Sequence, residues 1–213
     1  MNGKHTEFEI SELIRILAEC YPEAYCALEY SKDYELLFSA RLSAQCTDAR
    51  VNTITPELFA RYPTLESIAN ADVSEIESII FSCGFFRSKA RDIVDAAAML
   101  LLEFGGRVPD TMDELLRLPG VGRKTANLML GDIHNKPAVV VDTHCIRLSN
   151  RIGLVATKDP LKIEIELREI LPPEASSDFC HRLVLHGREV CTARNPACDV
   201  CRIASLCNYR TGR

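Results

Sequence analysis

The chain has 213 residues, 47% of them hydrophobic, which is enough apolar material for a sizeable core in one or two domains. Its longest uninterrupted apolar run, residues 96–102, is far shorter than the roughly 20 residues that a membrane-spanning helix needs. The first residues lack the apolar region of a secretory signal. We therefore expect a cytoplasmic protein without membrane contact, whose ten cysteines do not form a disulfide framework.

The net charge of −5 is unevenly distributed. The first 116 residues carry 10 Lys and Arg against 20 Asp and Glu, and the rest of the chain carries 15 against 10. A molecule polarised in this way can present a basic face to an anionic partner in spite of its acidic total. Chance clustering of charges is the alternative.

Taken in chain order, the sequence predicts helices joined by short turns. Residues 6–9 read as a capping box for a first helix through residue 18, residues 34–42 are rich in apolar side chains, and a second helix follows Thr47. Capping residues, glycines and apolar periodicity then predict helices over residues 72–84, 87–104, 111–116, 125–133, 143–152, 160–170 and 174–190. Residues 137–141 are strand-like, but a lone strand cannot build a sheet, so we expect a buried extended connector and an all-α fold.

A glycine-rich turn before the helix at residues 125–133 is the most informative motif. Gly120, Val121 and Gly122 form a turn where backbone N–H groups can converge, and the positive end of the following helix points to the same place. This combination favours an anion, most simply a phosphate. The spacing is neither that of the dinucleotide fingerprint nor that of a P-loop.

Lys124 lies at the mouth of this predicted anion site. As a nucleophile it must be neutral, which near pH 7–8 requires its pKa to fall by roughly two to three units, or about 3–4 kcal/mol. A helix N-terminus supplies only about 0.3–1 kcal/mol, so desolvation must account for most of the change. A simple phosphate contact is the alternative role.

Asp142 is the second candidate for chemistry. An opposite charge favours the ammonium form of a lysine, so this carboxylate is not expected to activate Lys124 by proximity. It can instead stabilise a developing cation on a substrate or transfer a proton. Its position before Thr143 also makes it a candidate N-cap.

The C-terminal segment carries four closely spaced cysteines, Cys191, Cys198, Cys201 and Cys207. Thiolates in this number favour an iron–sulfur cluster or zinc. The gaps on either side of the Cys-x2-Cys core do not make two zinc knuckles and favour a 4Fe–4S cluster, with four free thiols as the least favoured alternative. The remaining cysteines are expected to be small core residues.

Residues 84–89 form a further motif, in which a helix-ending glycine precedes two phenylalanines and two cations. Such a segment can push an aromatic wedge into a base stack. Core aromatics are the alternative.

The order and spacing of these motifs resemble those of the endonuclease III family, helix-hairpin-helix DNA glycosylases with an iron–sulfur cluster loop. The resemblance rests on Leu118–Ala126, on Val141–His144, on the four cysteines and on Leu42–Asp48, and it runs from about residue 13 to residue 209.

The resemblance implies an all-α helix-hairpin-helix glycosylase fold, with two helical domains flanking a DNA-binding cleft and a C-terminal 4Fe–4S loop. Residues 26–136 would form a six-helix barrel, and residues 1–25 plus 137–213 the cluster domain. The implied activity is that of a bifunctional DNA glycosylase/AP lyase of base excision repair, which removes oxidised or damaged pyrimidines and cleaves the abasic site by β-elimination.

The resemblance also assigns roles to residues. Lys124 and Asp142 fall on the family's catalytic lysine and aspartate, and the four cysteines on its cluster ligands. Gln45 falls on the residue that fills the gap left by the extruded nucleotide, and Phe85 on the wedge of the opposite strand. The full set of expected DNA contacts is Gln45, Phe85, Gly120, Val121, Gly122, Arg123, Thr125, His144 and Arg194. We expect a monomer on damaged double-stranded DNA, associated with the nucleoid in a prokaryote, with a monovalent cation as a candidate ligand at the hairpin.

Two departures from the family pattern stand out. The wedge position, often leucine, is Phe85, and a larger wedge can change the preference for the opposite base. The loop that carries Arg194 has few cations, which predicts weaker and less salt-dependent DNA binding.

Three alternatives remain open. A monofunctional glycosylase of the same superfamily would lack the lysine, a non-catalytic helix-hairpin-helix module would need only the backbone grip, and an iron–sulfur electron carrier would need neither Gln45 nor the glycine hairpin.

Overall fold

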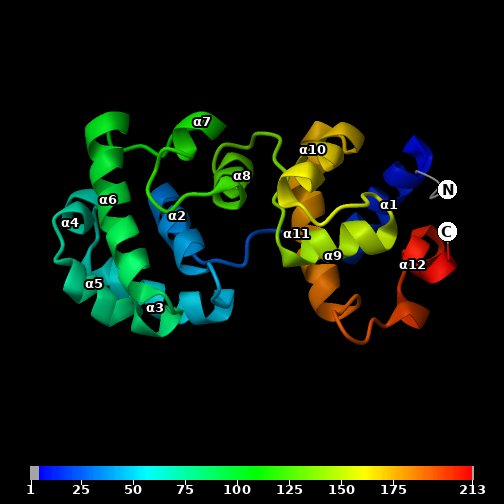
Figure 1. Ribbon diagram of the computed structural model, residues 1–213, viewed down its shortest axis with the longest axis horizontal. Helices are drawn as coiled ribbons and strands as arrows, with labels where there is room; N and C mark the ends of the chain where they lie inside the picture. Colours follow the sequence, from blue (N-terminus) through cyan, green and yellow to red (C-terminus); the bar gives the residue numbers. More distant parts are fainter. Residues whose placement is uncertain (1–4, 213) are drawn as a thin grey trace. The chain divides into compact units, whose positions relative to one another are not determined.

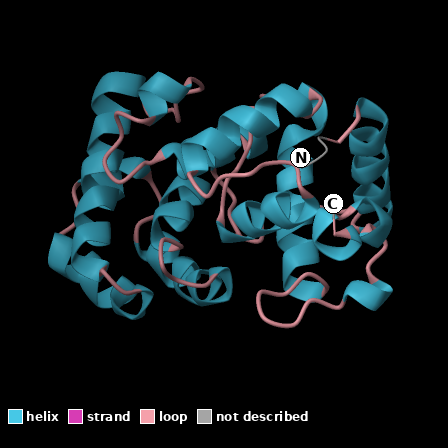
Figure 2. Ribbon diagram, turned by 45° about the vertical axis from the view of Figure 1, so that its right-hand side comes forward, coloured by secondary structure: helices cyan, strands magenta, loops and turns pink. Residues whose placement is uncertain are grey.

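The computed structural model describes residues 5–212, and in this part of the chain helices are joined by loops without any strand (Figure 2). The predicted all-α class is confirmed. Two compact units are formed, one by Cys26–His134 and the other by Met1–Tyr25 together with Asn135–Arg213. Among the described helices, none combines the length and apolar character that crossing a membrane requires.

In the Cys26–His134 unit, most helices begin at an N-cap residue whose side chain caps the first turn. Thr47, Thr64, Asp72 and Thr111 each accept a hydrogen bond from a backbone N–H in the first turn of the helix that follows. The elements of the unit are α2 (Asp33–Leu42), α3 (Asp48–Arg61), α4 (Leu65–Ala69), α5 (Val73–Ile80), the 3-10 turn η1 (Phe81–Cys83), α6 (Phe86–Phe104), α7 (Met112–Leu115) and α8 (Arg123–Asp132) (Figure 1).

The core of this unit is organised around the 19-residue helix α6. Ile93, Ala97 and Leu100 recur at helical spacing, form an apolar stripe on one face of α6, and are all buried. The stripe packs against α4 and α5, which contribute the fully buried Ile68 and Ile76 (Figure 1). On the other side of the unit, α2 packs against α3 and α8, so the helix that carries Lys124 rests on a buried helix.

The other unit joins the start of the chain to its end, because α11 packs against both α1 and α9. Leu13, Leu17, Leu148, Phe179 and Leu183 form the centre of its core. Its elements are α1 (Glu7–Cys20), α9 (Thr143–Ile152), α10 (Pro160–Ile170), the 3-10 turn η2 (Pro173–Ala175), α11 (Ser176–Glu189), the 3-10 turns η3 (Cys198–Val200) and η4 (Ala204–Leu206), and α12 (Asn208–Thr211).

The segment before α9 is the predicted buried connector. Residues 137–142 carry no helix or strand, and Ala138 to Val141 are buried. The Ala138 N–H, which no sheet partner satisfies, donates to the Ser176 hydroxyl at 3.1 Å. This connector leads directly into Asp142.

All ten cysteines are free, as expected. Of the six outside the C-terminal segment, Cys83, Cys145 and Cys180 are buried, which agrees with a core role. Cys20, Cys26 and Cys46 are half-buried, so for these three the expectation of a core position was wrong.

Candidate functional site

The glycine hairpin is a tight turn at the start of α8. The Val121 N–H donates to the Leu118 carbonyl at 3.1 Å, and Gly120 has a φ of +73°. A Cβ at Gly120 would lie 2.6 Å from Nε of Arg41 and 2.9 Å from Cβ of Asp92. These two side chains form an ion pair at 2.6 Å, so glycine is required both by the backbone and by the packing.

Gly122 has a different reason to be glycine. It is the N-cap of α8 with ordinary extended dihedrals (φ −105°, ψ 177°), and as a glycine it supplies no side-chain cap. A Cβ built on it would meet nothing within 4 Å. Gly122 therefore leaves room for an anion to approach the first turn of α8.

The side chains around this terminus divide by exposure. Arg123 and Lys124 are exposed in the first turn of α8, whereas Val121 and Thr125 are half-buried. The amine of Lys124 thus lies at the surface of its unit, next to the helix end whose N-cap is Gly122.

Asp142 is held at the start of α9. Its Oδ1 accepts the Cys145 N–H at 2.7 Å, which confirms the N-cap role expected from the sequence. The residue is half-buried, and the buried connector fixes the backbone before it. The carboxylate is therefore set in one orientation while it retains acceptor capacity for a further partner.

His144, two residues further, is packed against α11. A Cβ at Gly187 would lie 2.6 Å from its Nδ1, and Arg147 Nη2 is 3.1 Å from the same nitrogen. Arg147 also donates to the Gly187 and Cys191 carbonyls. The ring thus helps to attach α9 to the beginning of the cysteine segment, a role that the sequence did not indicate.

Gln45 and Phe85 share an unusual conformation. Both are exposed, Phe85 by 67%, and both have left-handed backbones, with φ of +55° and +48°. Left-handed φ is uncommon for residues other than glycine and for a phenylalanine is a genuine outlier. Phe85 is the N-cap of α6, and the adjacent Phe86 contacts Phe81 with ring centroids 4.9 Å apart. The core alternative is therefore wrong for Phe85.

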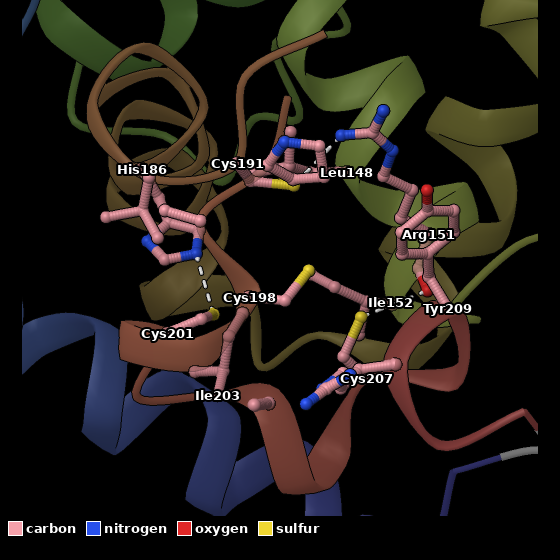
Figure 3. A pocket seen from close by; sticks show the side chains of 15 residues that line it. Leu148, Arg151, Ile152, His186, Cys191, Cys198, Cys201, Ile203, Cys207 and Tyr209 are labelled. Carbon is pink, nitrogen blue, oxygen red and sulfur yellow. Dashed lines mark hydrogen bonds between the residues drawn. The ribbon is translucent and has the colours of Figure 1, made fainter. Parts of the chain in front are cut away.

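The four C-terminal cysteines line one pocket (Figure 3). Its other lining residues come from α9, α11 and the segment around η3, η4 and α12. Within residues 5–212 no group of three or more His, Cys, Asp or Glu side chains converges closely enough for a single metal ion, whereas the four thiols surround this pocket. An all-sulfur donor set spread around a space fits the corners of a cubane better than one tetrahedral ion.

Side chains that the sequence did not single out contact these sulfurs. Arg151 donates to Cys191 Sγ at 3.3 Å and to the Thr192 carbonyl at 2.7 Å, and its guanidinium lies over the Tyr209 ring. The Cys207 thiol donates to the Arg151 carbonyl at 3.3 Å. These contacts attach the cysteine segment to α9.

His186 contacts Cys201 on the opposite side of the pocket. Its Nε2 lies 3.4 Å from Cys201 Sγ (Figure 3). Its Nδ1 lies 3.2 Å from the Tyr21 hydroxyl. Burial lowers the pKa of His186, which favours the neutral ring. A cluster-bound thiolate can only accept a hydrogen bond, so in the loaded protein Nε2 carries the proton. The one sequence signal for the contact between His186 and Cys201 is that His186 shortly precedes the segment with the four cysteines.

Burial raises the pKa of the Cys201 and Cys207 thiols. Both thiols therefore hold their protons more firmly than a free cysteine does, and binding of a metal centre would displace these protons. Arg194, by contrast, is exposed on the loop between the first two cysteines.

Comparisons with known proteins identify the same motifs. Residues 38–173 match the HhH-GPD superfamily base excision DNA repair protein model, and residues 191–207 match the iron–sulfur binding domain of endonuclease III. The chain is 48% identical over 198 residues to endonuclease III of Synechocystis, covering 92% of this chain and 90% of the relative. It is 40% identical over 208 residues to that of Bacillus subtilis, covering 97% and 93%.

The same relationship holds for structure. A trapped endonuclease III–DNA covalent intermediate superposes with a TM-score of 0.91 at 40% identity and covers 98% of this chain and 99% of the matched one. A thermostable thymine-DNA glycosylase at 23% identity, with a TM-score of 0.84, shares the fold. With a family model over more than half its length and these relatives over nearly all of it, the chain belongs to the endonuclease III family of base excision DNA repair proteins.

Proposed function

We propose that this chain excises oxidised or ring-damaged pyrimidines from duplex DNA and then cleaves the abasic site through a Schiff base on Lys124. Endonuclease III homologues are DNA glycosylase/AP lyases, and 40 to 48% identity over most of the chain supports this activity here. The observation that carries the lysine assignment is the exposed amine in the first turn of α8, whose glycine N-cap supplies no side-chain cap.

The α8 terminus binds the DNA backbone. Its first-turn N–H groups and the helix dipole favour one phosphate, and the missing side chain at Gly122 lets that phosphate approach closely. Val121, Arg123 and Thr125 flank the contact, and a monovalent cation can share the phosphate oxygens. This grip positions the sugar of the damaged nucleotide in front of Lys124.

Lys124 attacks the anomeric carbon as a neutral amine, and the glycosidic bond breaks with its electron pair leaving on the damaged base. The amine loses its proton, the C1′–O4′ bond of the sugar ring then breaks with a proton going to O4′, and the resulting Schiff base acidifies the C2′ proton. Loss of that proton drives β-elimination of the 3′ phosphate. Because Lys124 is exposed in its unit, water has to be excluded from around its amine by the bound DNA.

Asp142 stabilises positive charge on the sugar as the base leaves and transfers protons during the later steps. The fixed N-cap orientation makes the carboxylate pre-organised, so it needs no rearrangement when the charge develops. Gln45 occupies the gap in the duplex, and the exposed Phe85 wedges the opposite strand.

The cofactor is a 4Fe–4S cluster, and we assign as its ligands the four cysteines that line one pocket, Cys191, Cys198, Cys201 and Cys207. When bound, the cluster supplies the cross-link that orders a segment with little apolar core of its own. His186 and Arg151 hold the thiolates in place. Arg194, which is exposed, and His144, which is half-buried, are proposed to contact DNA. The enzyme acts as a monomer on damaged duplex DNA at the bacterial nucleoid.

A borohydride trapping experiment tests the proposal. The protein is incubated with duplex DNA that contains one abasic site, and borohydride reduces any Schiff base to a stable adduct. We expect an adduct with the natural protein and a decrease of about 10³-fold or more in Lys124→Ala, because the nucleophile is lost. The matched control is Lys158→Ala, which removes an exposed lysine in the loop after α9 and should leave the adduct unchanged.

Absence of an adduct with the natural protein would contradict the lyase activity. An undiminished adduct in Lys124→Ala would contradict only the assignment of the nucleophile.

A further inference from the structure

Lys89 is a buried cation outside the residues assigned so far. Its side chain is fully buried on α6, although lysine is almost never buried without partners. Its Nζ donates to the Leu42 carbonyl at 2.8 Å and to the Cys83 carbonyl at 2.7 Å. Two short hydrogen bonds to neutral acceptors explain how the ammonium remains inside the unit.

The two carbonyls lie two or three residues before the two left-handed residues. Leu42 ends α2, and Gln45 follows in the next turn. Cys83 ends η1, and only Gly84 separates it from Phe85. Lys89 therefore attaches to the bases of both loops that present the residues assigned to nucleotide extrusion.

The ends of helices are where a cation binds best. The last carbonyls of α2 and η1 lack partners within their own helices and carry the negative end of the helix dipole. An ammonium satisfies both at once and pulls the two helix ends together. The backbone N–H of Lys89 also donates to the Phe85 carbonyl at 3.2 Å, which adds a second attachment to the wedge.

The thiols beside Lys89 confirm that the two loops are close together. Burial raises the pKa of the Cys83 thiol to about 11, and the neighbouring Cys46 thiol adds to the increase. Cys46 directly follows Gln45. Left-handed φ at a non-glycine residue persists only where the surroundings fix it, and Lys89 with its two acceptors supplies such a fixed point.

We propose that Lys89 is a positioning residue for nucleotide extrusion, which holds the Gln45 and Phe85 loops in register by joining the Leu42 and Cys83 carbonyls. This inference rests on the proposed function, since it concerns the step in which the duplex is opened. Lys89 takes no part in the chemistry at Lys124, and its contribution is to the energy of the extruded state.

The test compares two substrates with the variant Lys89→Met, which retains the apolar stem and removes the two hydrogen bonds. In one duplex an oxidised thymine is paired with adenine, and in the other the same lesion lies in a one-nucleotide bulge, where no pairing has to be broken. Single-turnover excision of the paired lesion should fall by about 10²-fold, because a small misplacement of positioning groups has a large effect on rate. Excision from the bulge should be largely retained.

A fluorescent adenine analogue opposite the lesion supplies a readout independent of chemistry. With the natural protein, its emission should rise on binding as the base loses its stacking partner, and with Lys89→Met this rise should be reduced. Ile93→Val is the matched control. Ile93 is buried one turn further along α6 and takes no part in the hydrogen bonds to the Leu42 and Cys83 carbonyls. Ile93→Val should lose about as much folding stability as Lys89→Met does. It should retain excision of the paired lesion and the rise in fluorescence on binding.

An equal loss on both substrates, or no loss on either, would overturn the positioning role. Failure of the natural protein to process either substrate would instead contradict the proposed function, so the two failures are distinguishable.

Discussion

Two helices of this chain begin beside residues assigned to the chemistry, and their first turns are satisfied in opposite ways. The N-caps have nearly the same backbone, with φ −105° and ψ 177° at Gly122 and φ −107° and ψ −174° at Asp142. At α9 the N-cap carboxylate of Asp142 accepts a first-turn N–H, whereas the N-cap of α8 is a glycine that supplies no side-chain cap. Because the two N-caps have nearly the same backbone dihedrals, the two first turns differ through the N-cap side chain, which is absent in Gly122 and a carboxylate in Asp142.

The comparison shows two uses of one feature. A helix N-terminus attracts negative charge, and α9 fulfils this need with its own carboxylate, which becomes fixed in position. The glycine N-cap of α8 supplies no such charge, and under the proposed function this terminus binds a phosphate of the DNA instead. The proposed function thus gives the two termini different roles, one in positioning the Asp142 carboxylate and the other in binding DNA.

The largest expected effect comes from removing the charge at α9 without removing the cap. Asp142→Asn retains an oxygen that can accept the Cys145 N–H, and asparagine is as good an N-cap as aspartate. We expect base excision to slow by about 10²- to 10⁴-fold, with folding stability within about 0.5 kcal/mol of the natural protein. Single-turnover excision and urea unfolding measure the two quantities.

Asp142→Ala is the control, because it removes the cap as well as the charge. It should lose excision to a similar extent and, in addition, about 1 kcal/mol of stability. If Asp142→Asn instead lost stability and DNA binding in proportion to excision, the carboxylate would be a structural cap without a catalytic role.

The next largest effect is expected on folding stability, from a substitution in the turn that precedes α8. Gly120→Ala places a Cβ against the Arg41–Asp92 ion pair at a φ of +73°, so we expect a loss of about 1–3 kcal/mol in stability, measured by thermal or urea unfolding. Gly105→Ala is the matched control, since Gly105 has a φ of +60° and open space around its missing Cβ. An equal loss in both variants would mean that contact with Arg41 and Asp92 contributes nothing.

The helices themselves were predictable where capping residues and apolar periodicity coincide. Asp142 and the stripe of α6 are examples, and the strand-like residues 137–141 were correctly assigned to a connector. Helix α4 was missed because its five residues are too few to establish a period. The predicted helix over residues 174–190 begins instead as the 3-10 turn η2, with α11 starting at Ser176.

The candidate site was less predictable wherever its properties depend on tertiary contacts. The sequence motifs singled out Lys124, Asp142 and the four cysteines as candidates, and their roles stay predictions. The motifs gave no signal for the left-handed backbones of Gln45 and Phe85, because these depend on neighbours distant in sequence. Buried Lys89 was missed for the same reason, since a lysine in an amphipathic helix is normally expected at the surface.

The smallest expected effect comes from making the α8 terminus resemble that of α9. Gly122→Ser fits the extended backbone without strain and supplies an oxygen to the first-turn N–H groups, so stability should increase by roughly 0.3 kcal/mol. Affinity for abasic-site DNA should fall by about tenfold, because the added cap competes with the phosphate for the same donors. The dependence of affinity on salt should stay the same, because no cation is removed. Increased stability with unchanged DNA affinity would show that these N–H groups do not bind DNA. The N-termini of α8 and α9 would then differ in their N-cap residue but not in function.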